Sequence, residues 1–323
     1  MKILTRFMEN YIVDYRDIND FSAEVCGIYE DHATTSDQIN LILPDYLPSS
    51  KNVSIVSIKG FFINDFEILN KIVSIKFPTY LRFIGDYAFL CSNITSLRFP
   101  KLLNYIGEYS FKACQKLKEV YFDCEYLSEL GNGLFYECNS LSYVELPKHL
   151  KRIKANCFYG CNSLIKIVIP EEVNHIGHHA FYESGITEVL FIGPKPRIND
   201  KVFSKGEKTA YVKEEYLRDY LSDKHFRDAF SNILTIDSVQ LEIRVEGNKA
   251  EVIPSLDEFG KNRYKGCLRI PESIYKNNRK IKITKINQFA FFDSSLEKVK
   301  IPNYLSTDDL IFDSRIEIEK YKS

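Results

Sequence analysis

The stretch LFYECNSLSYVELPKHLKRIKANCFYGC (134–161) decides the fold, because it holds one complete copy of a unit that recurs along the chain. Near each of its ends lies a phenylalanine followed three residues later by a cysteine, Phe135 with Cys138 and Phe158 with Cys161. Between these markers, LSYVELP (141–147) alternates apolar and polar residues and closes on proline. Period-2 alternation bounded by a turn residue predicts a half-buried strand, and proline ends the ladder because it has no N–H to donate.

The same unit recurs on both sides of this stretch. Its marker phenylalanines are spaced 22, 24, 23 and 23 residues apart, and each lies two or three residues before a Cys or, in the last copy, a Ser. A unit this short cannot bury enough apolar surface alone, so a fixed period of about 23 residues indicates stacked coils, a solenoid. The markers are Phe89, Phe111, Phe135, Phe158 and Phe181.

Residues 55–205 resemble the BspA-like leucine-rich repeats, whose consensus is roughly LxxIxIPxxVxxIGxxAFxxC. The resemblance implies a mainly β repeat solenoid: a curved array of coils with a parallel sheet on one face and capping elements at the ends. It also implies a surface that binds proteins or other surfaces. The segment FDCEYLSELGNGLF (122–135) departs from the pattern, because it lacks the proline and carries one extra residue. We expect its turn to bulge.

The chain is expected to contain four parts: an N-terminal β cap with a degenerate first repeat (1–60), the repeat array (61–208), a helical cap (209–238) and a second hairpin cap with a short partial repeat unit (239–323). In the helical part, apolar residues recur at helical spacing, which predicts a helix that covers the last coil or, alternatively, binds a partner. Its apolar residues are Tyr216, Leu217, Tyr220, Leu221, Phe226 and Phe230.

The N-terminal segment is echoed near the other end of the chain. Ala23-Glu24-Val25 recurs as Ala250-Glu251-Val252, and Leu43-Pro44 recurs as Ile270-Pro271 at the same shift of 227 residues. The second copy alternates around Gly247-Asn248, a dipeptide that favours a hairpin turn. Both segments are therefore predicted to be hairpin caps that open an array.

Composition narrows the class of protein. The 323 residues carry 43 basic and 44 acidic side chains, a net charge of −1, so a dedicated nucleic-acid surface lacks its electrostatic driver. The sequence contains no run of eighteen apolar residues, so no membrane span is expected. The first residues show no secretory signal, which favours a cytoplasmic location, whereas the family resemblance favours the cell surface or secretion. The localisation is therefore left open.

Eight cysteines raise the question of disulfides or metal. Cys91, Cys114, Cys138 and Cys161 are assigned to one repeat position, where stacked coils would place them about 4.8 Å apart. A small apolar side chain suits such a buried column, so we expect a ladder of reduced thiols, with disulfides and a metal site as the alternatives. Cys157 stands where other units have Ala or Ser and is expected to be core.

The cluster His175, His178 and His179 could hold a transition metal, and a metal-dependent enzyme is the least favoured functional alternative. Solvated turn histidines are the preferred interpretation, because these positions vary between units. The chain contains no P-loop, GxSxG, HExxH or paired-cysteine zinc pattern, so no catalytic residue and no cofactor are expected.

The positions that the repeat leaves free are the candidate site. Inward strand residues are set by packing, and the residues between them point outward in two columns. Val168 beside Leu190 would form an apolar patch, unless the C-terminal cap covers Leu190. The site is expected to centre on Tyr121 and Tyr143. The candidate partner-binding residues are Lys76, Arg98, Glu119, Tyr121, Tyr143, Glu145, Lys166, Val168, Glu188 and Leu190.

These observations favour a non-enzymatic binding module with a protein as its partner. The interaction could be of adhesion type, and the ligand could also be a glycan or another surface ligand. The alternative of another class is an intracellular scaffold with the same fold. No nucleic acid and no membrane span are expected.

Overall fold

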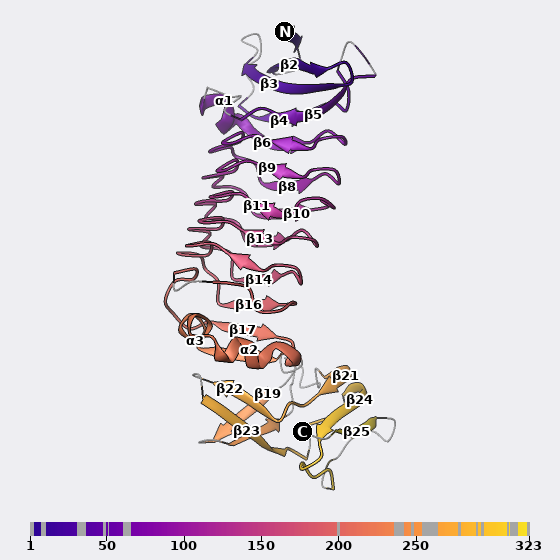
Figure 1. Ribbon diagram of the computed structural model, residues 1–323, viewed down its shortest axis with the longest axis vertical. Helices are drawn as coiled ribbons and strands as arrows, with labels where there is room; N and C mark the ends of the chain where they lie inside the picture. Colours follow the sequence, from indigo (N-terminus) through magenta and orange to yellow (C-terminus); the bar gives the residue numbers. More distant parts are fainter. Residues whose placement is uncertain are drawn as a thin grey trace. The chain divides into compact units, whose positions relative to one another are not determined.

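The computed structural model divides the chain into two compact units, residues 1–205 and 206–323 (Figure 1). The expected helical cap belongs to the second unit, and its role as a cap of the array stays a prediction. The residues described are 3–7, 11–30, 37–47, 50, 52–60, 66–198, 201–235, 242–246, 249–253, 264–276, 279–288, 290–291, 294–308, 310 and 316–321.

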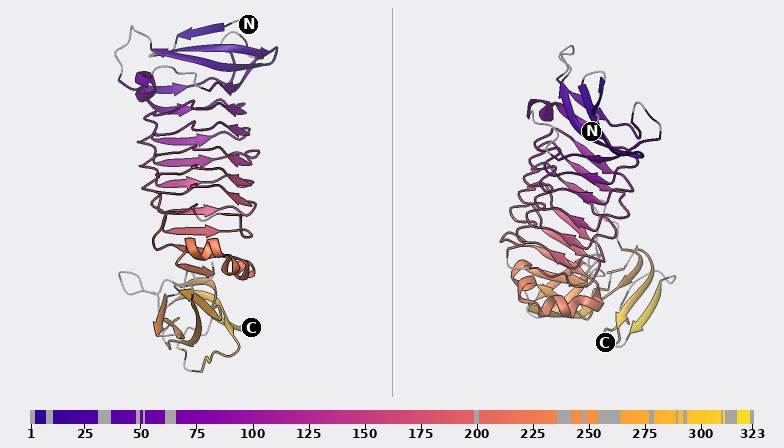
Figure 2. Two further views of the ribbon diagram at one scale, coloured as in Figure 1. Left: turned by 60° about the vertical axis from the view of Figure 1, so that its left-hand side comes forward. Right: turned by 45° about the horizontal axis from the view of Figure 1, so that its top comes forward.

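The first unit opens with strands that pair antiparallel and continues with stacked coils, as Figure 2 shows from two further sides. β3 of the antiparallel group pairs in parallel with β5, so the hairpin passes directly into the array. These opening elements are β1 (Ile3–Phe7), β2 (Tyr11–Asn19), β3 (Ser22–Glu30), β4 (Ile39–Ile42), β5 (Ser54–Ile58) and α1 (Phe66–Lys71).

Each coil from β6 to β15 contributes two strands rather than the single predicted one, and in the coil of β16 the second is reduced to a single bridge at Arg197. The second, short strand forms because the apolar pair after the proline turn, such as Leu150 and Ile153, is also drawn into the core. We call the two surfaces the long-strand face and the short-strand face. The long strands are β6 (Ile72–Lys76), β8 (Ser96–Phe99), β10 (Glu119–Phe122), β12 (Tyr143–Glu145), β14 (Lys166–Ile169) and β16 (Glu188–Phe191). The short strands are β7 (Phe83–Ile84), β9 (Tyr105–Ile106), β11 (Glu129–Leu130), β13 (Arg152–Ile153) and β15 (His175–Ile176).

Parallel pairing and period-2 alternation are confirmed on the long-strand face. Val120 of β10 pairs in register with Leu97 of β8 and with Val144 of β12, and all three are buried. Their outward neighbours alternate with them, because successive side chains of a strand point to opposite faces. The core of the array therefore lies between its two sheets.

The marker phenylalanines form the central column of this core, as predicted. All five are completely buried. Their rings stack on those of neighbouring coils with centroids 5.2 to 6.0 Å apart, and the column continues to Phe203. Aromatic pairs at these separations stabilise the fold beyond the area that they bury.

The assignment of Cys91 to the cysteine column was wrong. Cys91 has a left-handed φ of 61° and aligns instead with Ala113, since its amide donates to the next coil as that of Ala113 does. Ser92 occupies the column position, 3.2 Å from the Sγ of Cys114. The error arose because the first marker, Phe89, has a Cys two residues later, whereas the column lies three residues after each marker.

A hydrogen bond explains the residue type at this column. The thiols of Cys114, Cys138 and Cys161 lie 3.1 to 3.3 Å from the carbonyl oxygen of the marker phenylalanine one coil earlier and donate to it. A buried carbonyl needs a donor, and Cys supplies one in an otherwise apolar place. All eight cysteines are free in the structure, and their oxidation state in solution stays a prediction.

The irregular third unit bulges as expected. β10 keeps its register with β8, so the extra residue is accommodated after β10. Tyr126 lies there between buried Cys124 and Leu127, and it is 61% exposed. The core residues on either side thus keep their places.

The second unit repeats the pairing pattern of the first unit's beginning, which supports the predicted duplication. Ala23 pairs with Ile55 and Ala250 with Ile283, and in both copies the register shifts at the next residue. β19 and β20 form the predicted hairpin, while its turn residues Gly247-Asn248 lie outside the described residues. The described strands of the second unit are β17 (Thr209–Val212), β18 (Asn232–Thr235), β19 (Glu242–Glu246), β20 (Lys249–Ile253), β21 (Lys265–Arg269), β22 (Ser273–Lys276), β23 (Arg279–Ile286), β24 (Ser295–Pro302) and β25 (Glu317–Tyr321).

The single predicted helix is instead a helical turn and two short helices, η1 (Glu214–Tyr216), α2 (Leu217–Ser222) and α3 (Lys224–Ala229). Asp223 separates α2 from α3, because its backbone is extended and its side chain caps α3 by accepting a hydrogen bond from the amide of His225. Tyr220, Phe226 and Phe230 are buried as their spacing predicted.

Candidate functional site

The predicted columns lie on the long-strand face. Tyr121 pairs in register with Arg98 on one side and Glu145 on the other, and Glu119 pairs with Tyr143. Parallel pairing thus brings side chains from three coils onto one surface. Across β14 and β16, Lys166 pairs in register with Glu188 and Val168 with Leu190, which forms a second group.

Two tyrosines form the centre of this surface. The rings of Tyr121 and Tyr143 lie with centroids 5.5 Å apart at a tilt of 43°, and Tyr143 is 48% exposed. The guanidinium carbon of Arg98 lies 4.5 Å from the centroid of the Tyr121 ring, a cation–π contact. Arg98 also forms an ion pair of 2.8 Å with Asp123. The guanidinium of Arg98 is therefore positioned by two contacts, the ring of Tyr121 and the carboxylate of Asp123.

The hydroxyl of Tyr121 is also positioned. It donates a hydrogen bond of 3.1 Å to Glu119 Oε2. This bond to a carboxylate raises the pKa of Tyr121, because the tyrosine must keep its proton to donate. Tyr121 is therefore a neutral, oriented, half-buried side chain beside the exposed Tyr143.

The other half of the surface combines an ion pair with apolar side chains. Lys166 and Glu188 lie 2.9 Å apart across neighbouring coils; Lys166 is exposed and Glu188 is half-buried. Val168 is 42% exposed, whereas Leu190, its partner in register, is half-buried. The predicted apolar patch is therefore carried mainly by Val168. At the opposite end, Lys76 is exposed on β6 and pairs in register with Ile42.

The histidines do not form a metal site in the described part of the chain, where no group of three or more His, Cys, Asp or Glu side chains is placed to hold an ion. His178 and His179 lie at a turn with ring centroids 3.7 Å apart. His175 instead lies on β15, on the short-strand face. Burial, helped by the positive charges of His178 and Lys201, lowers the pKa of His179.

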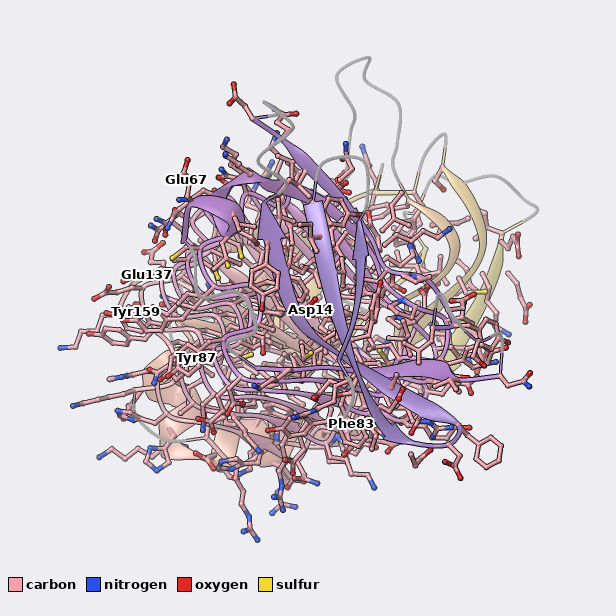
Figure 3. All side chains as sticks on the ribbon, turned by 90° about the horizontal axis from the view of Figure 1, so that it is seen from above. Asp14, Glu67, Phe83, Tyr87, Glu137 and Tyr159 are labelled. Atoms are coloured by element: carbon pink, nitrogen blue, oxygen red, sulfur yellow. The ribbon has the colours of Figure 1, made fainter. Side chains whose placement is uncertain are left out.

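The turn edge of the array carries a column of half-buried tyrosines. The rings of Tyr136 and Tyr159 stack at 4.7 Å and are almost parallel, and Tyr182 continues the stack at 6.1 Å. Seen along the array, Tyr159 and Tyr87 lie on a different side of the molecule from Phe83 (Figure 3). Because the rings cover each other's faces, this column stiffens the edge.

Sequence reasoning missed the residues of the short-strand face. Arg152, His175 and Arg197 pair in register on successive coils. With Lys154 and Asn174 they line a groove of about 600 Å³. The signal was present in the sequence, since Arg152 and His175 occupy equivalent positions 23 residues apart. The sequence pattern predicts turns here, because a two-residue strand leaves too short an alternation to detect.

Within the described residues, no helix is both long enough and apolar enough to cross a membrane.

Comparison with known families gives one extensive match. The profile described as "BspA type Leucine rich repeat region (6 copies)" matches residues 52–131, 82–210, 128–249 and 227–319, which together cover most of the chain. No curated protein matches the chain.

Several solved structures are similar over nearly the whole chain. A leucine-rich repeat protein from Bacteroides ovatus is 17% identical, with 98% of this chain and 100% of that chain covered and a TM-score of 0.39. A leucine rich cell surface protein from Faecalibacterium prausnitzii is 16% identical, with 99% and 76% covered and a TM-score of 0.42. The pneumococcal vaccine antigen PcpA is 13% identical, with 98% and 70% covered and a TM-score of 0.35.

Proposed function

Since this chain belongs to the BspA-type leucine-rich repeat family, we propose that it is a non-enzymatic module that binds a protein partner on the long-strand face of its first unit. The observation that carries the proposal is the adjacent, mutually tilted pair Tyr121 and Tyr143, in which Tyr121 is oriented by Arg98 and Glu119. Tyrosine and arginine are enriched where interfaces concentrate their energy.

The pre-positioning of these side chains favours binding. Ordering a flexible side chain at an interface costs about 0.5–1.5 kcal/mol, and a side chain already held by its neighbours avoids part of that cost. Tyr121 is held by the hydrogen bond to Glu119 and by the guanidinium of Arg98. The ion pair of Lys166 with Glu188 and the exposed Val168 extend the surface along the array. The surface thus combines an aromatic centre with a charged rim, as specific interfaces do.

The finer form of the proposal is an adhesion-type role, in which the partner lies on another cell or surface. An intracellular scaffold would use the same face. Fractionation of the native cells separates the two, because an adhesion-type protein is recovered with the envelope or the medium and a scaffold with the cytosol.

The experiment immobilises the full chain, identifies the captured proteins by mass spectrometry, and then measures direct binding of each purified candidate by biolayer interferometry. Tyr143→Ala is the test variant. Tyr126→Ala is the matched control, since Tyr126 is a similarly exposed tyrosine outside the strands. The proposal requires Tyr143→Ala to weaken binding while Tyr126→Ala does not. Equal binding by both variants rejects the long-strand face as the site.

A further inference from the structure

The short-strand face of the first unit carries a column of basic side chains. On the short-strand face, backbone pairing places Arg152, His175 and Arg197 in one column, on coils about 4.8 Å apart. The amide of Arg197 donates to the carbonyl of Asn174, and the amide of Ile176 donates to the carbonyl of Arg197. The backbone under the groove is therefore fixed by ladder hydrogen bonds, and the basic side chains project from a rigid base.

The groove carries an excess of positive charge. Glu129 forms ion pairs with Arg152 at 3.2 Å and with Lys154 at 2.9 Å, so one carboxylate is shared between two cations. Among the described residues, no acidic side chain lies within ion-pair distance of Arg197 or His175. Within the described part of the chain, the groove therefore offers one guanidinium without an ion pair and a second whose carboxylate partner is shared with Lys154.

The groove continues into a smaller depression of about 130 Å³, which shares Lys154 and is lined by Tyr105 and by two carboxylates, Glu108 and Glu129, so the acidic residues of a ligand belong over the arginines and not here. Beyond it, the rings of Phe83 and Tyr105 are 46% and 45% exposed, with centroids 6.2 Å apart and planes inclined by 44°. Two inclined rings form a notch that fits an apolar side chain. They do not form the flat platform that a sugar ring or a nucleobase would stack on.

We propose that the short-strand face binds an extended peptide segment of a partner protein, with acidic residues over Arg152 and Arg197 and an apolar or aromatic residue at the notch of Phe83 and Tyr105. Phe83 and Tyr105 pair in register, as do Glu129, Arg152, His175 and Arg197; the ladder is interrupted between Tyr105 and Glu129, which line the same depression. Six coils at about 4.8 Å each give a length of roughly 24 Å. An extended chain spans this distance in about seven residues at about 3.3 Å each. The site goes beyond the long-strand face and does not depend on it.

Carboxylates are the anions that fit best. The planar fork of arginine bonds both oxygens of a carboxylate, and such charge-assisted bonds are about twice as strong as neutral ones. A nucleic acid would need many phosphate contacts, whereas this chain has a net charge of −1 and its basic residues here form one short group. A sulfated glycan could satisfy the arginines alone, but it would leave the aromatic notch unused.

The test uses fluorescein-labelled octapeptides of sequence EDEEGFSF and its reverse, with QNQQGFSF as the uncharged counterpart and a heparin-derived octasaccharide as the glycan probe. Binding to the full chain is followed by fluorescence anisotropy at low ionic strength, where charge interactions are least screened. The test variant is Arg152→Ser with Arg197→Ser. The matched control is Lys116→Ser with Lys148→Ser, which removes the same charge from exposed positions away from the groove.

We expect one of the acidic peptides to bind, the test variant to weaken binding by at least about tenfold, and the control to change it less than about twofold. Tyr105→Ala should weaken the acidic peptide by a smaller factor. Each variant keeps its melting temperature, since the substituted side chains are exposed. The proposal is overturned if QNQQGFSF binds as well as EDEEGFSF, if neither acidic peptide binds, or if only the octasaccharide shows the dependence on the two arginines. None of these outcomes bears on Tyr121 and Tyr143, so the two sites fail separately.

Discussion

Ser92 Oγ lies 3.2 Å from Cys114 Sγ, inside a column that continues through Cys138 and Cys161. Serine and cysteine are interchangeable here because each is a small side chain with one donor. The three cysteines donate to the carbonyl of the coil before them, whereas Ser184 donates to Phe181 of its own coil, so the column requires a small side chain with a donor and not sulfur chemistry.

Thiol reactivity should follow this arrangement. Burial raises the pKa of Cys124 to about 12 and that of Cys138 well above its ordinary value, so neither forms the reactive thiolate at neutral pH. We expect Cys267, which is exposed, to react first with a thiol reagent in the native protein, and all eight to react after denaturation without reductant. Mass spectrometry of the labelled protein measures both. Fewer than about seven free thiols in the denatured protein would show that disulfides form.

The marker phenylalanines should carry much of the stability. Phe158 is completely buried between Phe135 and Phe181, at 5.5 and 5.3 Å. Phe158→Ala should lower the free energy of unfolding by about 3–5 kcal/mol, through lost transfer energy and the cavity left behind. Chemical denaturation measures this. Phe83→Ala, the same change on the exposed column, is the control, and similar losses for the two variants would contradict the assigned register.

Removing both central tyrosines should weaken the partner without harming the fold. We expect Tyr121→Ala with Tyr143→Ala to reduce the binding free energy by about 2 kcal/mol or more, roughly a thirtyfold weaker Kd. The melting temperature should change little, because the core beneath, including Val120, is untouched. Interferometry with the identified partner tests this. Normal binding by this variant, with binding abolished by substitutions at His175, His178 and His179, would place the site on the short-strand face and the turn that follows it.

The ion pairs of Glu129 should make the free energy of unfolding fall at acidic pH. The hydrogen bond from Lys154, with the charges of Lys154 and Arg152, holds the pKa of Glu129 below its ordinary value of 4.5. A carboxyl whose pKa is lower in the folded state stabilises the fold above its unfolded pKa, and that stabilisation is lost as the pH falls through the folded value. Glu129→Gln should therefore flatten the loss of stability below about pH 4.5.

Denaturant melts at a series of acidic pH values measure this slope. Glu125→Gln is the matched control, because Glu125 forms a more exposed ion pair with Lys101 and such pairs contribute little. A wild-type acid slope retained in Glu129→Gln would contradict the prediction.

The sequence by itself determined the repeat, its register and the division of residues into core and surface. This was possible because every coil repeats the same packing problem, so Phe135 and Phe158 had to be alike while Tyr143 and Lys166 did not. The 227-residue echo likewise predicted the second cap, and the matching register shifts after Ala23 and Ala250 agree with it.

Tertiary structure alone decided the features that depend on neighbouring coils. Cys91 lies outside the cysteine column because its backbone adopts a left-handed conformation and its amide donates a hydrogen bond to the next coil. No local sequence pattern reveals this. The basic groove arose in the same way. Arg152, His175 and Arg197 lie more than twenty residues apart in sequence, and only parallel pairing at about 4.8 Å per coil places their side chains on one surface.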